Sequence, residues 1–178
     1  MRTAIYGLLV LVALSLGACA TTKNNVEKTA EQEKLGKMVQ AGNFIYNATN
    51  ANPQRINVLN ILPNGAGQQL QHLSPGYYLS LAKDTLKVYL PFFGRAYQAN
   101  LDSKDNGIEF ETTDYKYQFD RNRRGYYNIT IQVNNQKSAS KFTLNISDDG
   151  YGTLQVQSVQ RDQMSFYGQV SPQKSDIL

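Results

Sequence analysis

Leu86-Lys87-Val88-Tyr89-Leu90-Pro91-Phe92-Phe93-Gly94-Arg95-Ala96-Tyr97 joins a short alternating run to an aromatic cluster. The opening residues alternate apolar and other side chains, which predicts a half-buried strand. Pro91 has no backbone N–H and cannot donate a hydrogen bond to a neighbouring strand, so we expect the strand to end there or to lie at a sheet edge. If Phe92 and Phe93 were both exposed to water, each would forgo the roughly 1.5–3 kcal/mol of stability that burial of a large apolar side chain contributes. At least one of them should therefore pack inward. The segment therefore predicts a strand, a kink and a buried aromatic plug.

A recognition surface is the alternative interpretation of this segment. Gly94 permits a backbone geometry that a Cβ would forbid, and Arg95 and Tyr97 then fall on one face of an extended chain. Tyrosine and arginine are favoured anchors at protein interfaces. The candidate partner or ligand surface comprises Phe92, Phe93, Arg95 and Tyr97. Arg95 and Tyr97 carry most of this expectation, because core packing already accounts for the two phenylalanines.

The same segment carries a resemblance to a known family. Tyr89–Tyr97, together with Asn106-Gly107-Ile108-Glu109-Phe110, resembles the signature of the DUF4251 family of uncharacterised Bacteroidetes lipoproteins. The closing run of that family is matched by Ser158, Arg161, Met164, Phe166, Tyr167 and Gly168. Asn106 stands where a glycine is usual and Asn100 where a proline is usual, but Asn tolerates positive φ well enough for a turn. The resemblance implies a location and a fold, and it implies no activity.

The N-terminal residues have the pattern of a lipoprotein signal peptide. Arg2 supplies a positive charge, and the uncharged, apolar Ala4–Ala18 is too short for a comfortable transmembrane span. Leu16-Gly17-Ala18-Cys19 matches a bacterial lipobox, whose cysteine accepts a diacylglycerol. We therefore expect a signal peptide over residues 1–18, and a membrane anchor at Cys19 with acyl chains such as palmitate. Cys19 is the only cysteine, so no disulfide can form within the chain.

The residues after Cys19 bear on location. In the bacteria of the resembled family, an acidic run just after the cysteine tends to direct lipoproteins to the cell surface. Ala20-Thr21-Thr22-Lys23-Asn24 contains no acidic residue. We therefore expect a cell-envelope protein, anchored in the outer membrane and facing the periplasm.

Length and charge limit the classes of function. Removing residues 1–18 leaves 178 − 18 = 160 residues, which suits one domain with its own core. The remaining charge is 18 − 1 = 17 Lys and Arg against 14 Asp and Glu, or +3. Only Arg121, Arg123 and Arg124 cluster, in a predicted solvated turn for which an anionic partner is the alternative. So small a charge on an exported protein argues against nucleic acid as a partner.

Periodicity divides the chain into one helix and about ten strands. After a tether over residues 19–25, the spacing of Leu35, Met38 and Val39 predicts an amphipathic helix that stops before Gly42. The strands expected from period-two alternation are Phe44–Tyr46, Ile56–Leu62, Tyr77–Ala82, Leu86–Leu90, Ile108–Thr112, Tyr115–Phe119, Tyr127–Val133, Phe142–Ile146, Leu154–Val156 and Met164–Val170.

Short connections between these strands favour antiparallel neighbours. We therefore expect a single α+β domain over residues 26–171, built as a curved antiparallel sheet or open barrel with the N-terminal helix packed on it. A closed barrel or a sandwich is the alternative. Residues 172–178 are expected to form a loose tail.

Residues that carry chemistry are sparse. His72 is the only histidine and has no Gly-x-Ser-x-Gly elbow to accompany it, so neither a triad nor a zinc site is indicated. Asp102–Gly107 only faintly resembles a calcium loop, because Lys104 occupies a ligand position. Glu109 and Glu111 share one strand face, as many solvent-facing pairs do. We expect no catalytic residue, no metal and no cofactor.

The function expected from the sequence is a non-catalytic envelope lipoprotein that binds another envelope protein. The alternative is a small-ligand or glycan-binding module that uses an aromatic sheet face, since the chain has 12 Tyr and 7 Phe, although it has no Trp. Asp84-Thr85-Leu86 also resembles an acceptor motif for O-glycosylation in Bacteroidetes, which makes Thr85 a candidate modification site.

Mass spectrometry of the exported protein checks both covalent expectations. The mature N-terminal residue should be Cys19 carrying a diacylglycerol, because the lipobox places the cleavage site directly before it. An unmodified Cys19, or cleavage elsewhere, would refute the anchor. The same spectra should show an added glycan mass on the peptide containing Thr85, and Thr85→Ala should remove this added mass. If Thr85→Ala changes the mass only by the substitution itself, Thr85 is not a glycosylation site.

Overall fold

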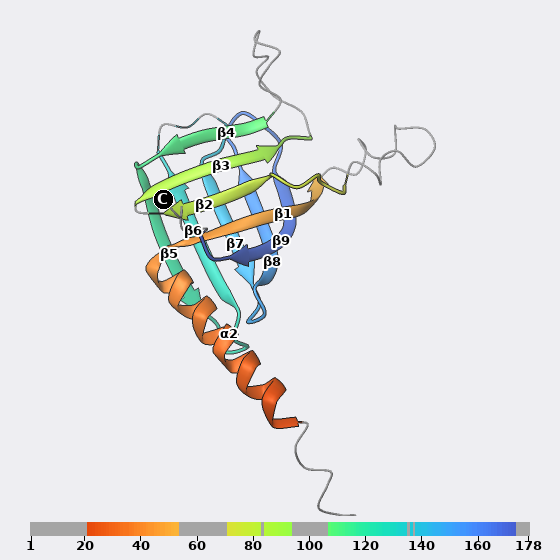
Figure 1. Cartoon of the computed structure of the whole chain (residues 1–178). Coiled ribbons are helices and arrows are strands. Elements are labelled where there is room, and N and C mark those ends of the chain that lie inside the picture. The colour runs from red at the N-terminus through yellow and green to blue at the C-terminus, as the bar shows by residue number, and fades with distance from the viewer. Residues whose placement is uncertain are drawn as a thin grey trace, which may run out of the picture. The chain divides into compact units, whose positions relative to one another are not determined.

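The expected alternation of apolar residues builds a single antiparallel sheet (Figure 1). The computed structural model describes residues 21–53, 71–82, 84–93, 107–134, 136 and 138–173, with the backbone alone for residues 21–29 and Pro53. Within these residues the elements are α2 (Thr21–Ala41), β1 (Phe44–Pro53), β2 (Tyr78–Ala82), β3 (Thr85–Pro91), β4 (Gly107–Thr112), β5 (Tyr115–Arg121), β6 (Tyr127–Val133), β7 (Lys141–Ile146), β8 (Tyr151–Gln157) and β9 (Met164–Ser171).

The nine described strands follow the order β4-β3-β2-β1-β9-β8-β7-β6-β5. Every neighbouring pair is antiparallel. The strands β1–β4 cross over β5–β9, so that the sheet curls into a nearly closed, barrel-like form (Figure 1). The predicted fold class, a mostly antiparallel sheet with one N-terminal helix, is confirmed. The chain divides into two units, Met1–Lys34 and Leu35–Leu178, and the sheet lies in the second.

Several boundaries differ from those expected. The helix begins at Thr21, inside the segment expected to be a tether. The first strand extends from Phe44 to Pro53, well beyond the expected Tyr46, and its pairing with β9 shifts register between Ala48 and Asn50. This irregularity and three asparagines hide the strand from a search for alternation, because asparagine is depleted in strands. The expected strand Ile56–Leu62 lies outside the described residues.

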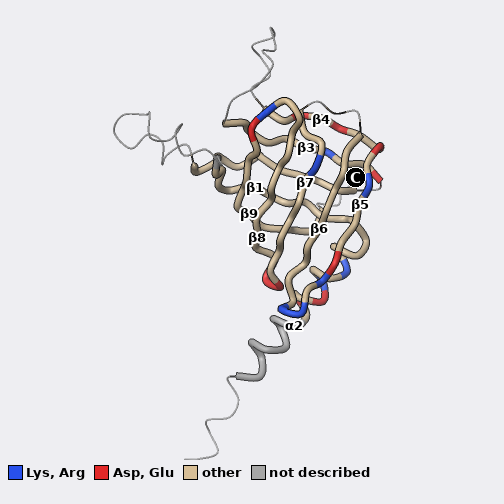
Figure 2. Tube along the Cα trace, turned by 180° about the vertical axis from the view of Figure 1, so that it is seen from behind, with Lys and Arg blue, Asp and Glu red and all other residues tan. Residues whose placement is uncertain are grey.

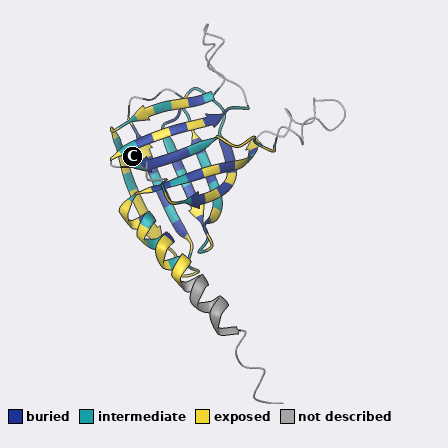
Figure 3. Ribbon diagram, viewed as in Figure 1, coloured by how far each residue is buried: buried dark blue, intermediate teal, exposed yellow. Residues whose placement is uncertain are grey.

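The inner face of the sheet forms the hydrophobic core. Burial alternates along the strands, as Figure 3 shows, and β6 is the clearest case because Tyr127, Ile129, Ile131 and Val133 are all buried. The two crossing parts of the sheet meet through ring contacts such as Phe110 against Phe142, whose centroids lie 6.2 Å apart. One continuous core therefore joins strands from both parts.

The helix ends as the sequence predicted. Gly42 has a positive φ of 59°, and the Gly42 and Asn43 N–H groups donate to Val39 O and Met38 O at 3.1 and 3.0 Å. This is the Schellman arrangement, which a glycine after the last turn favours. Val39 O also accepts a 2.6 Å hydrogen bond from the Tyr117 hydroxyl. The last helical turn is therefore fixed to β5 before the chain enters β1. None of the described helices is long and apolar enough to cross a membrane.

A buried tyrosine organises the middle of the sheet. The Tyr46 ring is fully buried, and its hydroxyl donates to Phe166 O at 2.9 Å and lies 3.2 Å from Gly152 O. Gly168 and Gly152 give this region its close backbone packing, because a Cβ on Gly168 would collide with Asn47 O and one on Gly152 with Asn145 O. Only glycine fits such an approach within a strand. β1, β8 and β9 are thus joined by one ring.

Burial raises the pKa of Tyr46 and of Tyr117 above the ordinary tyrosine value. The folded protein therefore keeps two protons that the unfolded chain releases above about pH 10. Stability from these groups is complete below that pH and is lost as the pH rises, by up to about 1.4 kcal/mol per group and pH unit.

Tyr46→Phe should lower the free energy of unfolding at pH 7 by about 1 kcal/mol, because the variant loses a buried hydrogen bond. It should also make the loss of stability above pH 10 shallower. Chemical denaturation as a function of pH measures both effects. Tyr89→Phe, at an exposed ring, is the matched control and should change the neutral-pH stability by less than about 0.5 kcal/mol. Parallel alkaline curves for the parent and Tyr46→Phe would show that Tyr46 holds no proton in the folded state.

Candidate functional site

The segment that carries the family resemblance is partly core and partly surface. Val88 and Leu90 are buried, whereas Tyr89, between them, points outward and is 41% exposed. Phe92 and Phe93 are half-buried and pack against the core, as expected for an aromatic plug. Arg95 and Tyr97 lie outside the described residues, so the recognition surface that they were expected to form stays a prediction.

Arg161 joins the two distant halves of the resemblance. Its guanidinium carbon lies 5.1 Å from the centroid of the Phe92 ring, and its Nη1 donates to Gly107 O at 2.7 Å. A planar guanidinium can stack on a ring and bond to a carbonyl at the same time. Arg161 therefore connects the end of β3, the start of β4 and the segment before β9. The spacing along the chain gives no sign of this contact.

Three tyrosines form the aromatic surface beside this segment, here called the tyrosine surface: Tyr77, Tyr78 and Tyr89. The Tyr89 ring stacks on Tyr77 at 5.3 Å with an interplanar angle of 18°, and Tyr78 lies 6.3 Å from Tyr89 in a tilted arrangement. Tyr78 is paired with Tyr89, and Tyr89 with Glu109, across neighbouring strands. Strict alternation along β3 could have placed Tyr89 on this outer face, but the neighbours depend on strand pairing.

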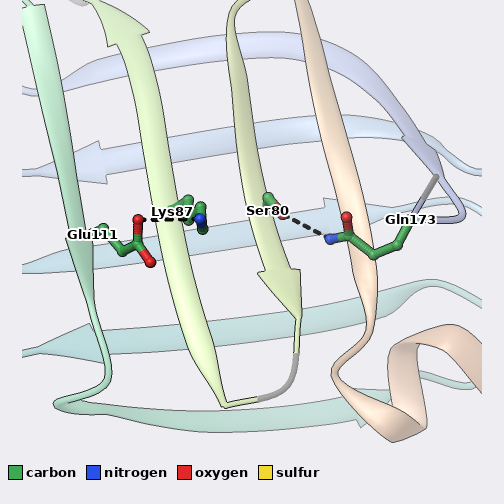
Figure 4. Close-up of polar contacts among 4 residues, drawn as sticks. All are labelled: Ser80, Lys87, Glu111 and Gln173. Carbon is green, nitrogen blue, oxygen red and sulfur yellow. Dashed lines mark hydrogen bonds and ion pairs between the residues drawn. The ribbon is translucent and has the colours of Figure 1, made fainter. Parts of the chain in front are cut away.

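A polar row borders the tyrosine surface on the outer face of the sheet. Figure 4 shows Glu111, Lys87, Ser80 and Gln173 side by side across the strands. Lys87 Nζ lies 3.1 Å from Glu111 Oε2, with both side chains more than half exposed. Gln173 Nε2 donates to Ser80 Oγ at 2.7 Å and to the carbonyl oxygens of Phe44 and Leu81 at 2.9 Å. These contacts hold the described end of the chain against β1 and β2.

A second pair of exposed rings lies on the outer face of β8 and β9. Tyr151 and Tyr167 are 43% and 49% exposed. Their ring centroids lie 6.3 Å apart and the planes differ by 12°. The two stacked rings form an aromatic platform on the outer face, which had not been predicted from the sequence. The alternation of β9 places Tyr167 outward between Phe166 and Gly168, and that signal was available.

The residues considered for chemistry are dispersed. His72 is exposed in the described structure, and its Nδ1 lies 3.0 Å from Asn50 Nδ2. Among the described residues no group of three or more His, Cys, Asp or Glu could hold a metal ion. Of the faint calcium motif, residues 102–106 lie outside the described part, as does Cys19. Thr85 is the half-buried first residue of β3, directly after the exposed Asp84.

The arginine turn between β5 and β6 is ordered by short-range hydrogen bonds. Asn122 Oδ1 accepts from the N–H groups of Arg124 and Tyr126 at 2.9 and 3.0 Å. Arg121 folds back over the Tyr127 ring at 5.0 Å and donates to Gly125 O at 3.3 Å. Figure 2 shows basic and acidic residues mixed around this end of the sheet. The mixture favours the solvated turn over a site for an anionic partner.

These features define a class: a barrel-like antiparallel β protein with aromatic surfaces on the outside of its sheet. The model of the domain of unknown function DUF4251 matches residues 26–170, so the chain belongs to the DUF4251 family. The resemblance to DUF4251 seen in the sequence is thereby confirmed. Among curated proteins, none matches the chain.

A solved structure of this family is similar to the chain. It is the crystal structure of a DUF4251 family protein from Bacteroides eggerthii, with 11% sequence identity and a TM-score of 0.48. The match covers 80% of this chain and 88% of the other.

Arg161→Lys should lower the free energy of unfolding by about 1 kcal/mol although it keeps the charge, because lysine cannot reproduce the planar stack and the directed bond. Thermal or chemical denaturation measures the change. Arg123→Lys, on the exposed turn, is the matched control and should be neutral. Equal stabilities for the two variants would show that the Arg161 geometry contributes nothing.

Proposed function

We propose that this protein is a non-catalytic lipoprotein of the cell envelope, and that its tyrosine surface binds another envelope protein. The observation that carries the proposal is Tyr89. It is a large ring, 41% exposed, which is flanked along β3 by the buried Val88 and Leu90 and stacks on Tyr77. A ring that is already ordered in the free protein loses little conformational entropy when a partner covers it.

The surroundings of Tyr89 have the composition of an interface. Tyrosine is enriched among the residues that dominate binding energy, and an interface has an apolar centre with a polar, solvent-accessible rim. Here the three tyrosines supply the centre, and Lys87, Glu109 and Glu111 lie around them on β3 and β4. Tyr89 also belongs to the same stretch of sequence as Arg95 and Tyr97, the residues that were expected to act in recognition.

The location of the partner follows from the proposed anchor. A lipidated Cys19 would hold the domain at a membrane through two or three acyl chains, which is enough for stable attachment. The absence of an acidic run after Cys19 supports a position in the outer membrane that faces the periplasm. A partner confined to the same membrane or to the adjacent periplasm would meet this surface at a high effective concentration.

Tyr89→Ala should reduce recovery of the partner at least tenfold when native complexes are captured from solubilised envelopes. Truncating a central interface ring costs about 2 kcal/mol or more. Tyr151→Ala is the matched control, because Tyr151 is also an exposed, stacked tyrosine on the outer face. Equal recovery with the parent chain and with folded Tyr89→Ala would refute the proposal.

Binding of a glycan or another small ligand is the second candidate, and the Tyr151–Tyr167 platform favours it. Small-ligand sites are lined predominantly by hydrophobic and aromatic side chains, and these two exposed rings offer such a lining. This candidate predicts the reverse pattern in the same variants: Tyr151→Ala loses a carbohydrate ligand, and Tyr89→Ala retains it. Glycan-array binding by the parent and the two variants therefore distinguishes the two functions.

A further inference from the structure

The strand β5 is the last strand of the sheet, and its outer side is exposed. It pairs with β6 and with no other described strand. From Gln118 to Arg121 every residue of β5 is exposed, and Phe119 is 42% exposed although it lies on the inner face. An open hollow of about 590 Å³ runs along β5 and β6, lined by Tyr117, Gln118, Phe119, Asp120, Asn128 and Thr130. The strand therefore has room for a neighbour.

The hydrogen bonds of the β5–β6 hairpin show which backbone N–H and C=O groups of β5 point away from β6. At its two ends, the Asn122 N–H donates to Tyr126 O at 2.9 Å, and the Asn134 N–H donates to Asp114 O at 3.3 Å. In an antiparallel pair, residues that face the partner alternate with residues that face away. Even-numbered residues of β5 thus direct their backbone groups to β6. The N–H and C=O groups of Tyr115, Tyr117, Phe119 and Arg121 point to the open edge.

The sequence of β5 is complementary to itself about its central residue. If two copies of Tyr115-Lys116-Tyr117-Gln118-Phe119-Asp120-Arg121 lie antiparallel with Gln118 opposite Gln118, Lys116 faces Asp120 and Tyr117 faces Phe119. Twofold symmetry repeats each of these pairs. Opposite charges and aromatic rings are both favourable cross-strand pairs.

Among the described residues of one chain, Lys116 and Asp120 have no partner of opposite charge. Lys116 is paired across the ladder with Gln132, and Asp120 with Asn128, and both neighbours are neutral. In the part of the chain that the structure describes, neither charge makes an ion pair with another residue. The two charges lie four residues apart on one strand, about 13 Å, so they cannot reach each other. An antiparallel second copy of the strand would bring an opposite charge to both of them.

We infer that β5 pairs antiparallel with β5 of a second copy of this chain, about a twofold axis at Gln118. The contact is isologous, so one surface serves both copies and the assembly closes as a dimer. In this register Tyr117 and Phe119 of opposite chains exchange N–H···O bonds, which satisfies the free edge. The exposed Phe119 ring is covered by Tyr117 of the other copy and extends the Tyr117–Phe119 contact already present at 6.1 Å.

The charges also select the register. A shift of two residues in either direction separates Lys116 from Asp120, and one of these shifts places Asp114 opposite Asp120. Like charges directly opposite each other destabilise a pair of strands. Charged residues on an edge strand commonly prevent unwanted pairing, and here their symmetric placement favours one pairing alone. The dimer uses a surface separate from the tyrosine surface, so it goes beyond the proposed function.

A single cysteine on the axis tests the geometry in the full-length chain in intact cells. In the dimer Gln118 meets its own copy at a non-hydrogen-bonded position, with Cα atoms about 4.5 Å apart, which suits a disulfide. Gln118→Cys should therefore give a disulfide-linked dimer under mild oxidation. Thr130→Cys, on the next strand and opposite Gln118, is the matched control and should stay monomeric, as should the parent chain with Cys19 alone. Equal crosslinking at positions 118 and 130, or a product with a different protein, would overturn the inference.

Charge reversal tests the complementarity by the same readout. In the Gln118→Cys chain, Lys116→Glu sets two acidic residues opposite each other twice, and the dimer yield should fall roughly ten- to thirtyfold. Adding Asp120→Lys exchanges the two charges and should restore the dimer. Both residues are exposed, so the substitutions leave the core intact. A double variant as weak as the single one would overturn the pairing register.

Discussion

Thr113 and Asp114 connect strands from opposite ends of the sheet order, and the rest of the structure depends on this short connection. β4 ends at Thr112 and β5 begins at Tyr115, yet seven other strands separate them in the sheet. In a flat sheet the two strands would lie about 38 Å apart, whereas three residue steps span about 11 Å. The sheet must therefore curl until its two edge strands meet at this corner. Asn134 holds the corner to the end of β6 through Asp114.

Curling gives the sheet an inside and an outside with different chemistry. Large rings such as Tyr46, Phe142 and Phe166 fill the inside, and the close approach of β1, β8 and β9 requires Gly152 and Gly168. The outside keeps the tyrosines that alternate with the core residues, since every second side chain of a strand must face away. The corner joins β4 to β5 without pairing their edges along their length. A nearly closed barrel thus retains a free strand, which a fully closed one would lack.

The residues that carry the family resemblance divide between structure and surface. Arg161 contacts both Phe92 and Gly107 at one end of the barrel, so packing accounts for the chemistry of these three residues. Tyr89 belongs to the same segment, but packing of the core does not require its exposed ring. The functional proposal therefore rests on the outward residues, whose side chains core packing does not account for.

The sequence by itself determined the elements and the family. The alternation in β3, β6 and β7, the helix stop at Gly42 and the Asp148-Asp149-Gly150 turn each depend on neighbours along the chain. At that turn Gly150 has a positive φ of 85°, the conformation that an Asp-Gly turn requires. Local rules therefore predicted most of the strands and the fold class. They missed the full length of β1, because its register shift interrupts the alternation.

Only the tertiary structure decided which residues meet. Tyr77, Tyr78 and Tyr89 form one surface because β2 pairs with β3 in a particular register, and Tyr151 reaches Tyr167 for the same reason. Arg161 reaches Phe92 and Gly107 across a chain separation that no periodicity records, and the free edge of β5 exists because of the strand order. The physical reason is that alternation fixes the face of a strand on which a side chain lies. Its neighbours on that face depend on strand order and register, which the packing of the whole core selects.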